Sequence, residues 1–152
     1  MMKQLTRSMC TVGVLLLVVA CGGPVSAPEE ELRAWVAEGI DAASAKERRK
    51  LVGMISSAYT DARGNKRSDI EDMLRVYFLR QDKIALVSNI EEITVYDDTA
   101  ARIMLTVGMA GTNDGVLGFS ADAYRFALEL EKDGDEWLLI AARWGELGDE
   151  LR

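Results

Sequence analysis

The sequence predicts an α+β domain in which three N-terminal helices pack on a curved, four-stranded antiparallel sheet. Apolar residues recur at helical spacing between positions 29 and 80, whereas from Ile84 onward they alternate with polar residues. Helices and strands that occupy separate halves of a chain favour helices on one face of an antiparallel sheet. The length of 152 residues is enough for one domain of ordinary size.

The first predicted helix follows Pro28. Proline suits the first turn of a helix, and the glutamates at positions 29–31 place negative charge at its positive end. Its apolar positions are Leu32, Trp35, Val36, Ile40 and Ala43. A capping-box pattern, Ser44 followed by Glu47, predicts the start of a second helix after a very short turn. The apolar positions of that second helix are Leu51, Met54, Ile55 and Ala58.

A second capping box, Ser68 with Glu71, predicts the start of the third helix. A short extended piece and a turn at positions 64–65 precede it. This helix has the clearest apolar stripe in the chain: Ile70, Met73, Leu74, Tyr77 and Phe78. On its polar face, Glu71 and Arg75 are four residues apart, so they are predicted to form an ion pair.

The strands predicted from the alternation have apolar residues at positions 84–95, 103–109, 124–130 and 138–144. In the first strand the apolar phase changes after Ile90, which indicates a bulge near Glu91 and Glu92. Such a bulge would bend the strand and curl the sheet around the third helix. The residues predicted to share one face of the last strand are Leu138, Ile140, Ala142 and Trp144.

Turn residues predict how these strands are connected. The first hairpin turn is predicted at Asp97-Asp98, and the last is predicted to be centred on Asp133-Gly134. Glycine, Asn and Asp residues predict the longest loop at positions 110–118. The polar tail at positions 145–152 is expected to fray.

Residues 1–20 are predicted to be a signal peptide. Lys3 and Arg7 precede an apolar run of roughly ten residues, which is half of what a membrane-spanning helix needs. The ending Val18-Val19-Ala20-Cys21 resembles the lipobox of bacterial lipoproteins, in which the cysteine thiol is acylated and the chain is cut just before it. The resemblance implies that Cys21 becomes the lipidated first residue of the mature chain. The alternative is that Cys21 is only a small apolar residue in an ordinary secreted leader.

The lipobox resemblance implies a location in the cell envelope. Gly22 follows the cysteine in place of the Asp that usually retains such proteins in the inner membrane. We therefore expect a lipoprotein that is anchored by palmitate or a similar acyl chain in the inner leaflet of the outer membrane and faces the periplasm. Residues 21–28 would form a lipidated tether that reaches roughly 25 Å at most. Residues 29–152 would form the globular domain.

Charge and residue usage exclude several classes of function. Removal of residues 1–20 leaves 16 basic and 25 acidic residues, a net charge of −9, which disfavours nucleic acid as a partner. The chain has no histidine, the commonest general base and metal ligand, so no metal and no cofactor is expected. Cys10 leaves with the leader and Cys21 is consumed by the lipid, so no disulfide is expected either.

The domain resembles the nuclear-transport-factor-two-like superfamily, which includes ketosteroid isomerase, scytalone dehydratase and the SnoaL-like polyketide cyclases. The resemblance covers residues 29–144. The domain is also similar to small bacterial lipoproteins of this superfamily. It rests on the order of the elements, on residues 68–78, and on Tyr124-Arg125-Phe126 and Ala142-Arg143-Trp144. It implies a cone-shaped, cystatin-like α+β fold that is open at one end. In some members the cone binds small apolar molecules, and in others side chains fill it.

Six residues are candidates for lining the pocket of such a cone: Tyr59, Asp61, Tyr77, Met104, Tyr124 and Trp144. Aromatic residues at such positions more often belong to an ordinary core than to a ligand site. Asp61 is more typical of a turn or capping carboxylate before Gly64-Asn65. None of the six matches the ketosteroid isomerase motif position for position, so no catalytic residue is assigned.

We therefore expect a membrane-anchored, non-enzymatic module that binds a small apolar ligand or a periplasmic protein near the membrane. The alternative is an isomerase or dehydratase of the ketosteroid-isomerase type that uses a carboxylate and a phenol, with Asp61 and Tyr77 as the nearest ingredients. A third hypothesis is a structural module that forms a homodimer through the outer face of the sheet. Whether the cone is open or filled is left open by the sequence.

Overall fold

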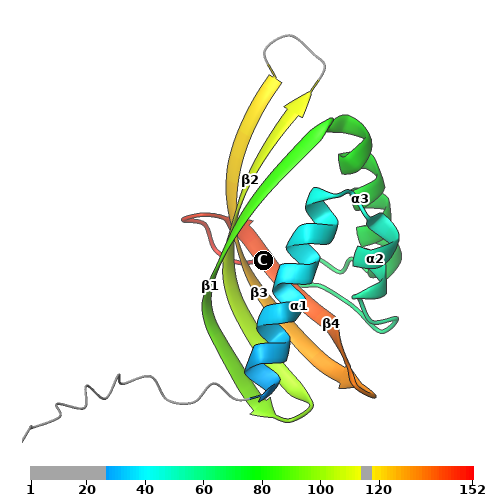
Figure 1. Cartoon of the computed structure of the whole chain (residues 1–152), viewed down its shortest axis with the longest axis vertical. Helices are drawn as coiled ribbons and strands as arrows, with labels where there is room; N and C mark the ends of the chain where they lie inside the picture. Colours follow the sequence, from blue (N-terminus) through cyan, green and yellow to red (C-terminus); the bar gives the residue numbers. More distant parts are fainter. Residues whose placement is uncertain (1–26, 114–117) are drawn as a thin grey trace, which may run out of the picture.

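The computed structural model describes residues 27–113 and 118–152, and the described residues form three helices and four strands (Figure 1). The helices are α1 (Ala27–Ser44), α2 (Arg48–Gly53) and α3 (Arg67–Arg80). The strands are β1 (Lys83–Asp97), β2 (Ala100–Asn113), β3 (Gly118–Asp133) and β4 (Glu136–Glu146). The strands pair antiparallel in chain order, so the predicted α+β class is confirmed. The predicted signal peptide and most of the tether lie outside the described residues.

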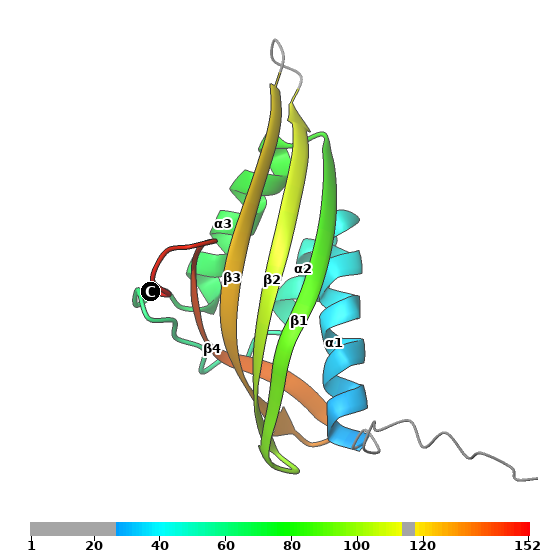
Figure 2. The ribbon, with the colours of Figure 1, turned by 90° about the vertical axis from the view of Figure 1, so that its left-hand side faces the viewer.

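The sheet curves around the helices, which all lie on its concave side (Figures 1 and 2). The register of β1 against β2 shifts between Ile90 and Glu92, which confirms the predicted bulge. Between β3 and β4 the register shifts between Glu129 and Leu130, which pair with Ala141 and Leu139 respectively, so Ile140 has no partner on β3. The prediction that Leu138 and Ile140 share a face with Ala142 is therefore wrong, because this bulge reverses the alternation.

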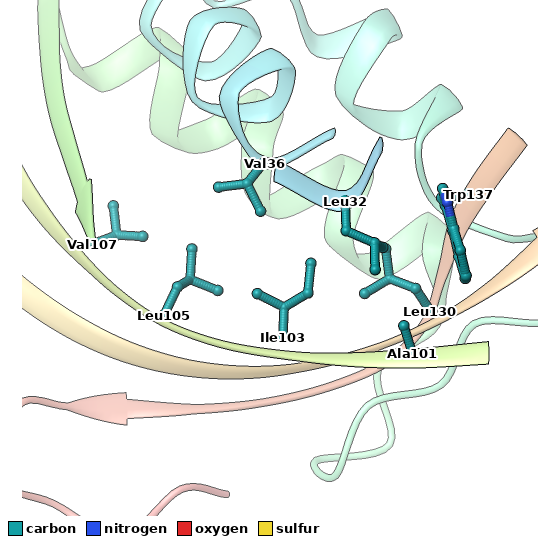
Figure 3. Close-up of a cluster of buried hydrophobic side chains, with 8 residues drawn as sticks. All are labelled: Leu32, Val36, Ala101, Ile103, Leu105, Val107, Leu130 and Trp137. Carbon is teal, nitrogen blue, oxygen red and sulfur yellow. The ribbon is translucent and has the colours of Figure 1, made fainter. Parts of the chain in front are cut away.

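The main core lies between α1 and the sheet. Leu32 and Val36 point from α1 toward Ile103 and its neighbours on the concave face (Figure 3). Each such side chain contributes about 1.5–3 kcal/mol through the apolar surface that it buries. At the N-terminal end of α1, the Glu31 carboxylate accepts a hydrogen bond from Trp137 Nε1 (2.8 Å) and pairs with Lys132 Nζ (2.7 Å). These two contacts fix α1 to the hairpin between β3 and β4, and they lower the pKa of Glu31.

The predicted start of the second helix at Ser44 is wrong, because α1 continues through Ser44. α1 ends in a Schellman motif, in which the N–H groups of Lys46 and Glu47 donate to the carbonyls of Ala43 (3.1 Å) and Ala42 (2.8 Å). Lys46 has a φ of 57° at this position, where glycine is usual. Its ammonium group donates to the carbonyls of Phe78 and Gln81, so the same turn also binds the C-terminal end of α3.

The start of α3 also differs from the prediction. The helix begins at Arg67, and the Asp69 carboxylate accepts a hydrogen bond from the N–H of Lys66 (2.8 Å). Glu71, the predicted capping residue, instead forms an ion pair with Arg48 of α2. Its predicted ion pair with Arg75 is replaced by a pair between Arg75 and Asp72 (3.1 Å). A contact between two helices thus outcompetes the local one that the spacing indicated.

α2 is shorter than its apolar spacing predicts. It ends at Gly53, and the segment that follows runs along the edge of β4. Ile55 pairs with Leu139, and the N–H groups of Thr60 and Ala62 donate to the carbonyls of Ile140 (3.1 Å) and Ala142 (3.2 Å). Ala58, expected on the apolar face of a helix, is exposed in this segment. The edge of β4 is thereby covered by the chain itself.

The connections deviate in small ways from the prediction. Each hairpin turn lies one residue later than predicted, because Asp97 pairs with Ala100 and Asp133 pairs with Glu136. β2 and β3 extend into the predicted long loop, of which positions 114–117 lie outside the described residues.

The tail, which was expected to fray, instead folds back onto β4. The backbones of Trp144 and Arg152 exchange two hydrogen bonds (3.1 and 3.3 Å). A Cβ atom on Gly145 would lie 2.8 Å from the carbonyl oxygen of Glu150, so only glycine allows this close approach.

Candidate functional site

An apolar cavity of about 290 Å³ lies between the helices and the concave face of the sheet. It is lined from α1, α2, α3 and the strands β2, β3 and β4. The lining residues are Trp35, Val36, Gly39, Ile40, Ala43, Leu51, Met54, Ile55, Ile70, Leu74, Leu105, Val107, Phe126, Leu128 and Leu139. No ionisable side chain occurs among these described residues.

The bend of the sheet and the position of α3 create this cavity. None of the 14 residues of α3 is buried, and Ile70 and Leu74 line the cavity from this helix. Charged contacts hold α3 in place at both ends: Arg67 Nε donates to the carbonyl of Val52 (3.1 Å), and Lys46 binds the other end. Because polar contacts position the helix, its apolar face does not close completely onto the sheet.

None of the six residues predicted as pocket candidates lines this cavity. Tyr59 and Asp61 lie in the segment beside β4, where Tyr59 is 2% exposed and packs in a small core cluster with Ile55 and Ala142. Met104 alternates with the buried Ile103 and Leu105, which places it on the outer face of the sheet.

Tyr77 lines a groove along α3, whereas Tyr124 and Trp144 line a second groove beside the tail. This second groove has a volume of about 660 Å³, and Arg63 also lines it. The Arg63 guanidinium lies 4.5 Å from the centre of the Trp144 ring and donates to the Trp144 carbonyl (3.2 Å). Of the predicted candidates, the structure therefore brings Tyr124 and Trp144 into one pocket.

Asp61 forms the centre of a tight turn. It is 5% exposed, and its Oδ1 accepts hydrogen bonds from the N–H groups of Arg63 and Asn65, both at 2.8 Å. Its Oδ2 accepts a third from Nδ2 of Asn65, also at 2.8 Å. The carboxylate is thus used by the turn, as the turn hypothesis predicts.

The phenols of Tyr59, Tyr77 and Tyr124 all have a raised pKa. Burial raises the pKa of Tyr59 far above its ordinary value, and the nearby Asp61 carboxylate raises it further. Burial is also the first cause for Tyr77 and Tyr124, and the Asp122 carboxylate adds to the rise in the pKa of both. All three phenols are therefore neutral at physiological pH and can donate a hydrogen bond but cannot act as a base.

The raised pKa of Tyr59 predicts a loss of stability at alkaline pH. In the unfolded chain the phenol ionises near its ordinary pKa of 10.0, whereas in the folded protein its pKa is higher. Its contribution to the free energy of unfolding is therefore complete below the ordinary pKa of 10.0, and it is lost as the pH rises from there through the pKa of the folded protein. We expect Tyr59→Phe to flatten the alkaline fall in unfolding free energy, measured by urea titration at a series of pH values. A fall of the same steepness in the variant would contradict this.

The lining residues are not predicted as a site from the sequence, because their periodicity assigns most of them to apolar core faces. Periodicity indicates which side chains turn inward. It carries no information on whether the enclosed volume is filled. The described residues also contain no group of three or more acidic or cysteine side chains that could hold a metal ion. None of the described helices has the length and hydropathy of a membrane span.

No protein family model matches this sequence, and no curated protein is similar to it. Solved structures, in contrast, match the fold well. A protein of the NTF2-like family from Streptomyces avermitilis, described as a dehydratase, has a TM-score of 0.68 and 9% identity, and the match covers 80% of this chain and 97% of that chain. The chain has the nuclear-transport-factor-two-like fold.

Two further structures with this fold show how varied its functions are. A ketosteroid isomerase-like protein from Erwinia carotovora atroseptica has a TM-score of 0.65 and 10% identity, and the match covers 79% of this chain and 96% of that chain. Hexachlorocyclohexane dehydrochlorinase LinA-type3 from Novosphingobium barchaimii has a TM-score of 0.66 and 10% identity, and the match covers 83% of this chain and 89% of that chain. At such low identity the likeness concerns the fold and leaves the function of this chain to its own residues.

Proposed function

We propose that the protein is a binding module for a small, neutral, apolar molecule, which occupies the cavity between the helices and the sheet. The observation that carries this proposal is the cavity of about 290 Å³ whose described lining has no ionisable side chain. Such a cavity gains free energy from any apolar surface that it removes from water. It cannot compensate the charge of an ionised ligand, because desolvation of an unpaired charge is costly.

The cavity is partly open, and its volume indicates how much of a ligand it encloses. An apolar cavity of about 150 Å³ in another protein holds benzene. The cavity described here has about 290 Å³, which fits two fused rings or a branched chain of similar bulk. A ligand of roughly ten carbon atoms gains about 6–8 kcal/mol from burial at about 0.8 kcal/mol per methylene, which corresponds to micromolar affinity.

Naphthalene is a suitable probe for this proposal, and we expect it to bind. The fluorescence of Trp35, which lines the cavity, and calorimetric titration both report the interaction. Leu74→Trp places a large side chain in the cavity, so we expect naphthalene affinity to fall at least about tenfold. Leu79→Trp is the matched control on the same helix, because Leu79 is 81% exposed.

Two results would contradict the proposal. One is the absence of naphthalene binding to the folded protein. The other is equal loss of affinity in both tryptophan variants, which would place the probe outside the cavity.

The alternative, an isomerase or dehydratase that uses Asp61 and Tyr77, has less support from the structure. Asp61 is engaged by three hydrogen bonds, and it lines a different groove from Tyr77. The likeness to a structure described as a dehydratase keeps this hypothesis open. An activity that is lost in Tyr77→Phe without loss of stability would favour it over the binding module.

We further propose that the binding module is attached to the cell envelope through a lipid on Cys21, with the domain facing the periplasm. The lipobox pattern at positions 18–21 supports this proposal. Mass spectrometry of the protein purified from bacterial membranes tests it, and an unmodified thiol at position 21 would contradict it. A ligand taken from or delivered to the membrane, or a periplasmic protein partner, would suit that location.

A further inference from the structure

Helix α3 presents two apolar faces. Ile70 and Leu74 face the cavity, whereas Met73, Val76 and Leu79 are 44%, 46% and 81% exposed. These three account for half of the large apolar side chains that are exposed among the described residues; of the other three, Val87 and Tyr96 lie on β1 and Leu147 follows β4. A groove of about 470 Å³ runs along this second face. Apolar side chains gathered on one exposed face mark a contact surface more often than chance.

The charges around this face are arranged in a specific order. At about 100° per residue, Asp72, Met73, Val76, Leu79 and Arg80 lie within about one third of the circumference of α3, with Val76 at the centre. The acidic residue is near the N-terminal end of the face, and the basic residue is near its C-terminal end. Asp72 has only an exposed ion pair with Arg75 in its own helix, and such pairs contribute little.

This face is complementary to itself about a two-fold axis that lies beside Val76 and runs perpendicular to the axis of α3. The axis places a second copy of α3 antiparallel to the first, because it exchanges positions that are equally distant from Val76. Met73 then lies opposite the second copy's Leu79, and Asp72 lies opposite the second copy's Arg80. A parallel arrangement would instead place Asp72 against Asp72. The complementarity in both shape and charge therefore selects one partner and one orientation.

We propose that this protein forms a homodimer through antiparallel pairing of α3. Figure 1 shows α3 on the side of the helical layer that is remote from the sheet, where a second copy can approach. The outer face of the sheet, the surface considered from sequence, is less suitable. Its charged residues already pair within the chain: Glu91 binds Arg125 and Thr106, and Arg102 binds Glu129 (2.7 Å).

The size of the face sets the strength of this dimer. A helix of 14 residues is about 21 Å long, so one helix pair buries less than the roughly 800 Å² per partner of a stable complex. We therefore expect a weak dimer that forms and dissociates with protein concentration.

Disulfide cross-linking in the full chain tests the geometry. Packed helices have axes about 8–10 Å apart and a Cα radius of about 2.3 Å, so two Cα atoms at position 76 lie roughly 3.4–5.4 Å apart, a span that overlaps the disulfide range of about 4.4–6.8 Å. We expect Val76→Cys to form a covalent dimer roughly tenfold faster than Val87→Cys under mild oxidation. Val87 is the matched control because it is more exposed, at 75%, but lies on β1. Mass spectrometry separates links at position 76 from links through Cys10 or Cys21.

Charge reversal tests the pairing without cysteine. Asp72→Arg alone and Arg80→Asp alone each place like charges together, so we expect both to abolish the concentration-dependent dimer in sedimentation velocity. The double reversal restores the opposite charges, and we expect it to restore the dimer. Circular dichroism confirms that each variant is folded.

Three results would overturn the proposal. The first is a monomer at every concentration, and the second is a dimer that both single reversals leave unchanged. The third is equal cross-linking of the two cysteine variants. A dimer that is lost in Met104→Glu and kept in the α3 variants would assign the interface to the sheet and would also overturn the proposal.

Discussion

Leu32→Ala is expected to lower the free energy of unfolding by about 3–4 kcal/mol, the largest effect of any single truncation considered for this protein. Leu32 is 0% exposed and packs from α1 between Ile103, Leu130 and Trp137 on the concave face of the sheet. Truncation removes its buried apolar surface and leaves a hole that the curved sheet cannot close. Urea denaturation monitored by circular dichroism measures the change.

Leu79→Ala is the matched control for this prediction. The same change of side chain at an 81% exposed position is expected to alter the free energy of unfolding by less than about 0.5 kcal/mol. Similar losses in both variants would mean that the packing of α1 on the sheet does not dominate stability.

Asp61→Ala is expected to lower the free energy of unfolding by about 2–4 kcal/mol. The change removes a buried carboxylate and leaves two backbone N–H groups and the side-chain amide of Asn65 without their acceptor. The turn that it breaks leads from the segment beside β4 into α3. Chemical denaturation measures the effect, and Asp98→Ala in the exposed first hairpin turn is the control.

The Asp61 variant also separates the two functional hypotheses. If Asp61 is structural, the fraction of Asp61→Ala that remains folded binds naphthalene with nearly unchanged affinity, because Asp61 does not line the cavity. A variant with wild-type stability and no enzymatic turnover would contradict the structural role and support a catalytic one.

The sequence determined the order and type of the elements. The alternation from Ile84 onward correctly predicted four antiparallel strands, and the change of phase after Ile90 correctly predicted a bulge. These predictions succeed because a strand places successive side chains on opposite faces, so an error of one residue would expose the whole apolar set. The inward positions of α1, Leu32 and Val36, were predictable for the same kind of reason.

Only the tertiary structure decided where the helices begin and end and which residues surround the cavity. Glu71 had a local partner in Arg75 but pairs with Arg48, and Lys46 reaches the carbonyl of Phe78, 32 residues away. The cavity depends on where α1, α2 and α3 lie against the strands, and contacts between residues far apart in the chain set those positions. Residue periodicity encodes the side to which each side chain points. The distance between two packed layers is a property of all their contacts at once, so it is fixed only when the chain has folded.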